Sequence, residues 1–220
     1  MQPKPAILLF SRSATAEAVA KYGGGNAQAD ALALALIRRT RHTVGRSGLP
    51  VYAFDERDQR GTTFGERLVN CVERVFAAGH AQVIIVGNDC PDLTVNHLHR
   101  AAALLDRGVQ VLGRDGRGGV WLLGLRKTAF DAQALQSLRW QTAHLAGDLS
   151  EILRGAQELT LLHDVNGIQD LRRGWWRWKT RFVCLSVFLH RRVVPVGHAR
   201  DWVSQSARTH LPGRAPPAAA

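Results

Sequence analysis

One run of six residues constrains the fold more than any other part of the sequence. Gln82-Val83-Ile84-Ile85-Val86-Gly87 has β-branched apolar residues at its four central positions. A strand that faced water on one side would alternate polar with apolar residues, so this run predicts a strand buried on both faces. Helices must then cover both faces, as they do around the parallel sheets of α/β proteins.

Strand-like and helix-like segments alternate along most of the chain. The other expected strands span 6–11, 49–54, 109–113, 120–125 and 158–162. The expected helices span 27–43, 64–78, 95–107 and 145–154, with a helical turn from Gly167. Asn26, Thr63 and Thr94 are predicted N-caps, because their side chains can accept a backbone N–H of the first turn. The alternation predicts an α/β fold with a mainly parallel sheet.

Length and composition fit a single medium-sized domain with a full core, since 45% of the 220 residues are hydrophobic. The longest apolar stretches are shorter than the roughly 18–20 residues that span a bilayer, and no N-terminal signal is evident. Cys71, Cys90 and Cys184 show no paired spacing. They indicate a reducing, cytoplasmic compartment and argue against a disulfide framework or a zinc site.

The net charge of +11 is concentrated at the C-terminal end. Residues 172–220 hold ten Lys/Arg and one acid, Asp201, which leaves 19 basic and 17 acidic residues in 1–171. The nearly neutral body gives no reason to expect a nucleic-acid partner. We therefore predict one folded domain over 1–171 and a basic Trp/Arg-rich extension over 172–220, with a disordered end. This extension could lie on an anionic membrane surface or pack as a C-terminal element.

The most specific chemical signal follows the central strand, in Gly87-Asn88-Asp89-Cys90-Pro91-Asp92-Leu93. Ligands of open parallel sheets bind at the carboxyl ends of strands, so Asp89 and Asp92 are candidate catalytic residues. Their carboxylates suit Mg²⁺ or Mn²⁺, which would neutralise the phosphates of a nucleotide. Alternatively, both aspartates cap the next helix. The functional reading is favoured for Asp89, while the two readings of Asp92 stay open.

Three ordered blocks carry a resemblance to a known family. They are the string 87–94, the upstream Phe64-Gly65-Glu66-Arg67-Leu68 and the downstream Gly118-Gly119-Val120-Trp121-Leu122-Leu123-Gly124-Leu125. Together they resemble the glycosyltransferase-A-like family of unknown function, whose named members are described as arsenosugar-biosynthesis glycosyltransferases. The resemblance covers about 6–171. It implies a Rossmann-like, three-layer GT-A fold of the nucleotide-diphospho-sugar transferases and, usually, a Mg²⁺ or Mn²⁺ ion.

The resemblance also implies roles for individual residues. Asp89 matches the family's metal- and nucleotide-facing aspartate. Arg67 could meet a phosphate, or Glu66 and Arg67 could be only a capping box and a surface arginine. Trp140 and Thr142 resemble an element that lines the acceptor side, although Trp140 could equally belong to the core.

Several positions depart from the family pattern. Asn166 stands where related nucleotidyltransferases carry a metal-binding aspartate, and it offers a carbonyl oxygen without charge. The usual phosphate-binding loop after the first strand is absent, so Arg12 and Lys21 are the available cations. In the segment that contains Gly118 and Gly119, Arg117 replaces an acid and Asp115 lies two residues early. Arg117 and the two glycines are candidate substrate-binding residues, and Asp115 is a candidate catalytic residue.

Three functions remain open at this point. The first is a glycosyltransferase that binds a nucleoside-diphosphate sugar and transfers the sugar to a small acceptor, with a divalent metal held by Asp89 and assisted by Asp115 or Asn166. The second is a nucleotidyltransferase that uses a nucleoside triphosphate and a phosphorylated acceptor. The third is a non-catalytic nucleotide-binding module that keeps the fold and has lost the chemistry.

Overall fold

The computed structural model describes residues 4–24, 26–179 and 182. Their strands form a six-stranded sheet in the order β2-β1-β3-β5-β4-β6. The strands are β1 Ala6–Phe10, β2 Val51–Phe54, β3 Gln82–Val86, β4 Val111–Arg114, β5 Val120–Arg126 and β6 Gln157–Glu158. Only β5 runs antiparallel to its neighbours among these strands, so the predicted mainly parallel sheet is confirmed.

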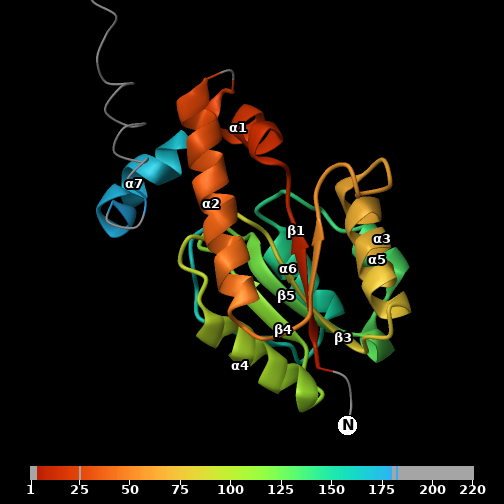
Figure 1. Cartoon of the computed structure of the whole chain (residues 1–220). Coiled ribbons are helices and arrows are strands. Elements are labelled where there is room, and N and C mark those ends of the chain that lie inside the picture. The colour runs from red at the N-terminus through yellow and green to blue at the C-terminus, as the bar shows by residue number, and fades with distance from the viewer. Residues whose placement is uncertain (1–3, 25, 180–181, 183–220) are drawn as a thin grey trace, which may run out of the picture.

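Helices cover both faces of this sheet (Figure 1). They are α1 Ala14–Tyr22, α2 Ala27–Gly45, α3 Phe64–Ala77, α4 Val95–Asp106, α5 Ala132–Gln136, α6 Leu145–Ile152 and α7 Ile168–Trp178, with a 3₁₀ turn η1 Lys127–Ala129. Alternate residues of β3 point to different layers. Ile84 and Val86 pack with residues of α4, whereas Val83 and Ile85 pack with residues of α3 and α6. The apolar run that predicted a doubly covered strand therefore lies at the centre of three layers.

The predicted helix starts are confirmed. The side chains of Asn26, Thr63 and Thr94 each accept a hydrogen bond from the backbone N–H three residues on. Thr63 and Glu66 complete a capping box at α3. The predicted strand over 158–162 is shorter in the structure. Strand β6 contains only two residues, and Leu162 forms an isolated bridge with Asp115.

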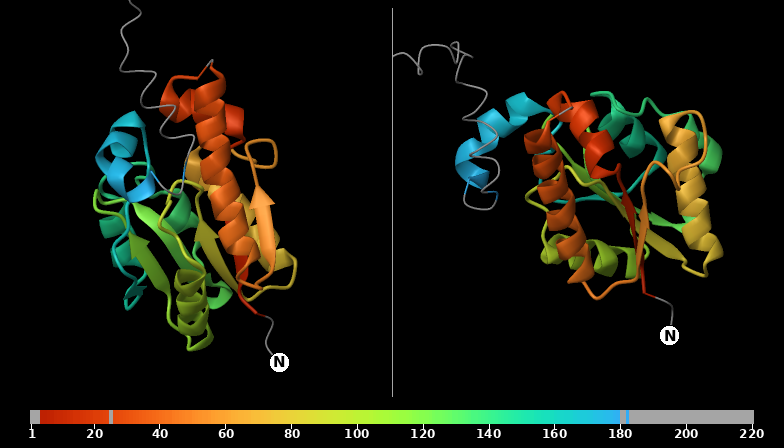
Figure 2. Two further views of the ribbon diagram at one scale, coloured as in Figure 1. Left: turned by 60° about the vertical axis from the view of Figure 1, so that its left-hand side comes forward. Right: turned by 45° about the horizontal axis from the view of Figure 1, so that its top comes forward.

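Helix α1 follows β1, where the sequence predicted no helix. Ser13 caps it by accepting the Ala16 N–H at 3.3 Å, and Gly23 ends it with a φ of +78°. The helix lies at the carboxyl end of the sheet beside α2 (Figure 2). Glu17 and Lys21, one turn apart, therefore lie on the same side of α1 and face the site described below.

Helix α7 crosses the predicted boundary between residues 171 and 172. Leu171 and Trp178 are buried in a third apolar cluster that also contains Tyr22 of α1 and Leu32 of α2. The described start of the basic extension thus shares a core with the body. Residues 183–220 lie outside the described residues, and with them the predicted disorder and most of the predicted membrane surface. Among the described helices, the structure contains none with both the length and the apolar character needed to span a bilayer.

Candidate functional site

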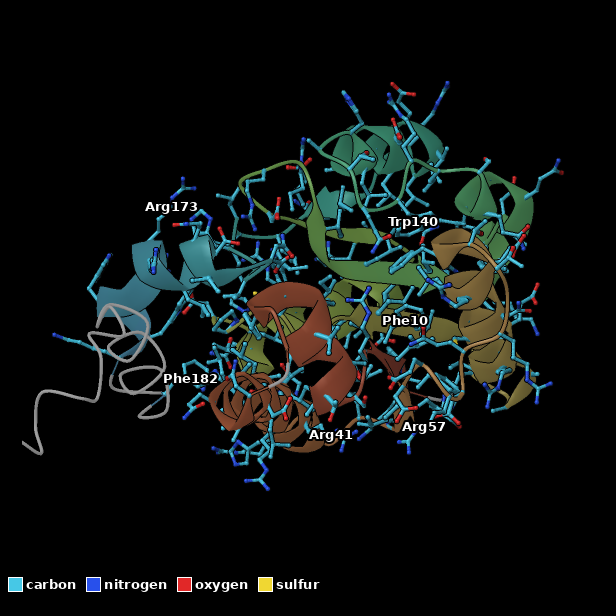
Figure 3. The ribbon with its side chains drawn as sticks, turned by 90° about the horizontal axis from the view of Figure 1, so that it is seen from above. Phe10, Arg41, Arg57, Trp140, Arg173 and Phe182 are labelled. Carbon is cyan, nitrogen blue, oxygen red and sulfur yellow. The ribbon has the colours of Figure 1, made fainter. Side chains whose placement is uncertain are left out.

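A cavity of about 170 Å³ opens at the carboxyl ends of β1 and β3. Five of the residues proposed from the sequence line it, namely Arg12, Lys21, Arg67, Asp89 and Trp140. The view from above places Phe10 and Trp140 on one side of α1, with Arg173 of α7 on the other (Figure 3). Lining residues that the sequence reasoning did not single out for function include Phe10, Glu17, Gln59, Phe64, Asn88 and Trp121.

Asp89 reaches this cavity from the loop after β3, where its side chain folds back over Gly87. A Cβ atom at Gly87 would lie 2.7 Å from Asp89 Oδ1. That separation is shorter than a van der Waals contact, so a larger residue at position 87 would displace the carboxylate. The glycine therefore makes room for the aspartate of its own motif.

The partner of Asp89 is Lys21. Lys21 Nζ lies 3.0 Å from Asp89 Oδ2 and 2.7 Å from Glu17 Oε1, and it donates to the Val165 carbonyl oxygen at 3.1 Å. Burial lowers the pKa of Lys21, but the carboxylates of Asp89 and Glu17 outweigh this effect and hold the pKa above its ordinary value. Lys21 is therefore a permanently charged cation at the end of β3.

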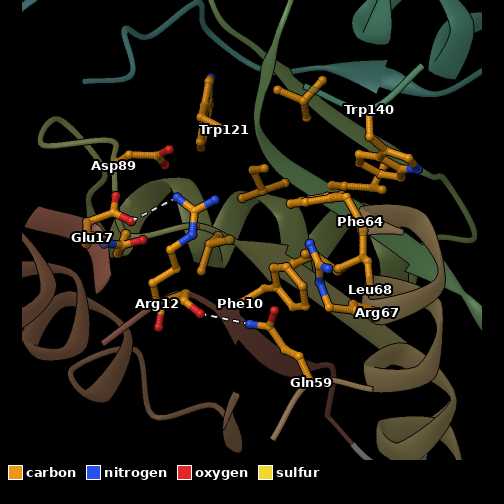
Figure 4. A pocket seen from close by; sticks show the side chains of 18 of the residues that line it. Phe10, Arg12, Glu17, Gln59, Phe64, Arg67, Leu68, Asp89, Trp121 and Trp140 are labelled. Carbon is orange, nitrogen blue, oxygen red and sulfur yellow. Dashed lines mark hydrogen bonds and ion pairs between the residues drawn. The ribbon is translucent and has the colours of Figure 1, made fainter. Parts of the chain in front are cut away.

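Two arginines add positive charge to the same cavity (Figure 4). Arg12, directly after Ser11 at the end of β1, extends toward Glu17, with Nη1 3.5 Å from Glu17 Oε2. Arg67 extends from the first turn of α3 and donates to the Thr62 carbonyl oxygen. Glu66, in contrast, is used by the helix cap, where it accepts from Thr62 and Thr63. Of the neighbours Glu66 and Arg67, Glu66 therefore caps α3 and Arg67 lines the cavity.

Aromatic rings form the wall of the cavity next to Arg67. The Phe64 ring lies 5.3 Å from the Phe10 ring and 5.2 Å from the Trp140 ring, measured between centroids. Trp140 is half-buried and its Nε1 donates to the Leu135 carbonyl oxygen at 2.7 Å. Gly65 permits this packing, because a Cβ there would lie 2.6 Å from the Gln136 carbonyl oxygen. Such a wall can stack against a planar ring of a ligand.

Two buried donors lining the cavity lack an acceptor in the described part of the chain. Asn88 is 6% exposed and Trp121 is 2% exposed. Neither Asn88 Nδ2 nor Trp121 Nε1 has a hydrogen-bond partner among the described residues. A buried donor without an acceptor costs about 1–3 kcal/mol, so a ligand that accepted from them would recover part of this cost.

The segment between β4 and β5 lies outside this cavity. Asp115 is buried and its Oδ1 accepts the backbone N–H groups of Arg117 and Gly119 at 2.8 and 2.7 Å. Gly118 has a φ of +83°, and its carbonyl oxygen accepts the Ala146 N–H at the start of α6. These contacts give Asp115, Gly118 and Gly119 roles in shaping the turn.

Arg117 borders a second cavity, of about 360 Å³, between this turn and α7. It donates to Asp170 Oδ1 at 2.6 Å and to the Asp164 carbonyl oxygen at 2.8 Å. The hydrogen bond to Asp170 is the main reason why the pKa of Arg117 is raised. The predicted phosphate-binding arginine is therefore paired with the protein itself.

Three other proposed residues also lie away from the first cavity. Asp92 forms an ion pair with Arg177 at 3.0 Å and accepts from Trp178 Nε1, which ties the motif to α7. Thr142 is exposed and donates to the Arg139 carbonyl oxygen before α6. Asn166 is exposed, and its backbone N–H donates to Asp170.

Asp164 is a buried carboxyl group that borders the second cavity. It is 7% exposed, and its Oδ1 has no hydrogen-bond partner among the described residues. Burial, followed by repulsion from Asp89 and Asp115, raises its pKa well above the ordinary 3.8. The residues next to Asp164 in the sequence do not signal this shift, because its charged causes, Asp89 and Asp115, are distant in the sequence.

We expect Asp164 to make stability fall with rising pH. The folded chain binds the Asp164 proton more tightly than the unfolded chain, so this contribution is lost as pH rises from about 3.8 through the raised pKa. Asp164→Asn removes it. The free energy of unfolding, measured by urea titration, should therefore fall less for the variant than for wild type as pH increases from 4 to 8. A difference that stays constant across this range would contradict the raised pKa.

The side chains around Asp89 do not fit a divalent cation. Lys21 already lies against Asp89 and Glu17, Asp115 Oδ1 accepts two backbone N–H groups of its own turn, and Asn166 is exposed outside the cavity lining. Among the described residues, no three His, Cys, Asp or Glu side chains are arranged to hold a metal ion. Since Mg²⁺ and Mn²⁺ require several oxygen ligands, we assign no step of the chemistry to such an ion.

The chain is similar to several solved structures. A "putative nucleotide-diphospho-sugar transferase" from Desulfovibrio desulfuricans G20 superposes with a TM-score of 0.72 at 19% identity, over 87% of this chain and 96% of that chain. Rv0371c from Mycobacterium tuberculosis H37Rv has a TM-score of 0.45 at 16% identity, over 79% and 97%. Its complex with manganese has a TM-score of 0.42 at 14% identity, over 77% and 97%. The first likeness confirms the predicted nucleotide-diphospho-sugar transferase fold.

Sequence comparison identifies the family. No curated protein matches the chain. The model of one bacterial family, described as "Uncharacterized protein conserved in bacteria (DUF2064)", matches residues 28–142, which is more than half of the 220 residues. This match agrees with the resemblance found in the motif blocks around Arg67, Asp89 and Gly118. The chain belongs to the DUF2064 family.

Proposed function

We propose that this protein binds a nucleoside-diphosphate sugar in the cavity at the ends of β1 and β3 and transfers the sugar to a small acceptor. The observation that carries the proposal is the combination of Arg12, Lys21 and Arg67 with the aromatic wall of Phe64 and Trp140. Guanidinium groups bind phosphate oxygens, and a planar ring of the nucleotide can stack on the aromatic side.

The charge of the cavity favours a diphosphate over a triphosphate. Arg12, Lys21 and Arg67 supply three positive charges, and Glu17 and Asp89 remove two of them. A triphosphate would leave more negative charge without a counterion in this cavity. This balance supports the nucleotide-sugar reading over the nucleotidyltransferase reading.

Transfer would break the bond between the anomeric carbon and the oxygen of the β-phosphate. The diphosphate leaves with the electron pair, the acceptor hydroxyl oxygen bonds to the anomeric carbon, and the hydroxyl proton passes to water. Arg12 and Arg67 would stabilise the charge that grows on the departing diphosphate. Asn88 and Trp121 would donate to ligand oxygens from the cavity wall.

A binding module without catalysis is the second candidate. It is favoured by the positions of Asp92 and Asp115, two of the candidate catalytic carboxylates, which lie outside the cavity and are engaged by the protein. Both candidates require nucleotide binding, and only the first requires release of a free nucleoside diphosphate on incubation with a sugar acceptor.

Calorimetry with UDP-, GDP- and dTDP-sugars tests the proposal. We expect at least one of them to bind, and Arg12→Ala or Arg67→Ala to weaken that binding by about 10–100-fold, the worth of a hydrogen bond to a charged group. Arg107→Ala is the matched control, because Arg107 is exposed at the far end of α4. If no sugar nucleotide binds, or if both variants bind as wild type does, the proposed function is wrong.

A further inference from the structure

The ammonium group of Lys21 lies in a setting built entirely of oxygen atoms. Glu17 Oε1, Asp89 Oδ2 and the Val165 carbonyl oxygen surround it at 2.7, 3.0 and 3.1 Å. These three contacts account for the three protons of the ammonium group. The Lys21 side chain is 11% exposed, so the contacts hold the charge at the edge of the cavity, away from bulk water.

The three oxygen atoms come from distant parts of the chain. Glu17 belongs to α1, Asp89 follows β3, and Val165 precedes α7. The Val165 N–H also donates to the Asp89 carbonyl oxygen at 2.7 Å, which fixes the two loops against each other. Two carboxylates and a carbonyl are ligands that a hard divalent cation accepts, but at about 2.0–2.6 Å. The observed spacing of 2.7–3.1 Å is that of an ammonium ion.

We propose that Lys21 is the built-in cation of this site and takes the place of a divalent metal. A nucleoside diphosphate in the cavity is then held by the fixed charges of Lys21, Arg12 and Arg67, and its binding does not depend on Mg²⁺ or Mn²⁺. This inference rests on the proposed function for its ligand, while the assignment of the cation rests only on the contacts of Lys21.

The charge of a divalent ion is reproduced by two side chains. Lys21 provides one positive charge between Glu17 and Asp89. Arg12 provides the other from the opposite side of Glu17, with its Nη1 3.5 Å from Glu17 Oε2. Its side chain is 40% exposed and extends into the cavity, where a phosphate can reach it. Glu17 thus positions both cations, and Asn166 is not needed as a ligand.

Mn²⁺ alone is the first probe, because it reports on the cation position without any nucleotide. We expect the wild-type protein to leave the electron paramagnetic resonance signal of free Mn²⁺ unchanged. Lys21→Met removes the ammonium group and leaves the carboxylates of Glu17 and Asp89 facing an empty position. This variant should bind Mn²⁺ at least about tenfold more tightly than wild type, and the ion should raise its lowered melting temperature.

Matched variants separate this gain from a general loss of charge. Lys127→Met removes an exposed lysine of η1 and should gain no Mn²⁺ binding. Asp89→Asn combined with Lys21→Met should lose the gain. Glu17→Gln combined with Lys21→Met removes the buried pair together. It should fold even if Lys21→Met alone does not, and it should bind Mn²⁺ more weakly than a folded Lys21→Met variant.

Two results would overturn the inference. One is Mn²⁺ binding to wild type that Asp89→Asn abolishes, and the other is a folded Lys21→Met variant without any gain. The nucleotide arm compares the affinity for the sugar nucleotide in EDTA and in MnCl₂, which should agree within about twofold. If the sugar nucleotide binds only in MnCl₂, the role of Lys21 is contradicted and the proposed function stands. If no sugar nucleotide binds under either condition, the proposed function is contradicted, and the Mn²⁺ titration alone tests the role of Lys21.

Discussion

Trp178→Ala should lower the free energy of unfolding by about 3–5 kcal/mol, the usual cost of truncating a buried tryptophan. Trp178 is 2% exposed in the apolar cluster shared by α1, α2 and α7. Its ring folds back over Gly174, where a Cβ would lie 2.2 Å from it, and its Nε1 lies 3.4 Å from both Asp92 carboxylate oxygens. The substitution removes the packing and this hydrogen bond together. Urea denaturation monitored by circular dichroism measures the loss.

Trp176 provides the matched control on the same helix. It is 71% exposed and contacts Arg177 by a weak cation–π interaction, with 5.9 Å between the guanidinium carbon and the ring centroid. Trp176→Ala should change the free energy of unfolding by no more than about 0.5 kcal/mol, as surface substitutions usually do. If Trp178→Ala were equally mild, the packing of α7 against α1 and α2 would contribute little to the stability of the protein.

Gly118→Ala should cost about 2–4 kcal/mol of stability, from backbone strain and steric overlap together. Gly118 has a φ of +83°, which alanine rarely adopts, and a Cβ there would lie 1.9 Å from the Ala143 carbonyl oxygen. The turn would have to move away from α6 and lose the hydrogen bond from Ala146 N–H to the Gly118 carbonyl oxygen. Thermal and urea denaturation of the purified variant would show the loss directly.

The control for Gly118→Ala is the same substitution at Gly147 in α6. A Cβ at Gly147 meets no described atom within 4 Å, and this residue is helical. Gly147→Ala should therefore stabilise the protein by about 0.5–1 kcal/mol through helix propensity. Equal effects at the two positions would show that the turn before β5 tolerates a side chain, and a direct role of Gly118 toward the substrate would then become the better explanation of the motif.

Much of the architecture follows from local patterns. The β-branched residues of β3 predict a strand covered on both faces, and Asn26, Thr63 and Thr94 predict where helices begin. The carboxyl end of β3 is the expected ligand site of an open parallel sheet, and the cavity lies there. Helix α1 was the main omission, although Ser13 and Gly23 are ordinary start and stop signals for a helix.

The candidate site was less predictable than the fold. Arg12, Lys21, Arg67, Asp89 and Trp140 line one cavity, as a shared site requires. The other proposed residues lie outside this cavity, where hydrogen bonds and ion pairs to other parts of the protein hold them, as Asp170 holds Arg117 and Arg177 holds Asp92. A motif shows which chemical groups are available, but the partner of each group depends on distant segments.

The sequence by itself therefore determined the α/β layers, the helix starts and the end of the sheet at which ligands should bind, because periodicity and capping act over a few residues. Only the tertiary structure decided how the charges pair. Lys21 and Asp89 are 68 positions apart, and Asp92 and Trp178 are 86 apart. Coulombic attraction and burial select such partners only after the chain has folded, and this selection directs Asp89 to a lysine and Asp92 to α7.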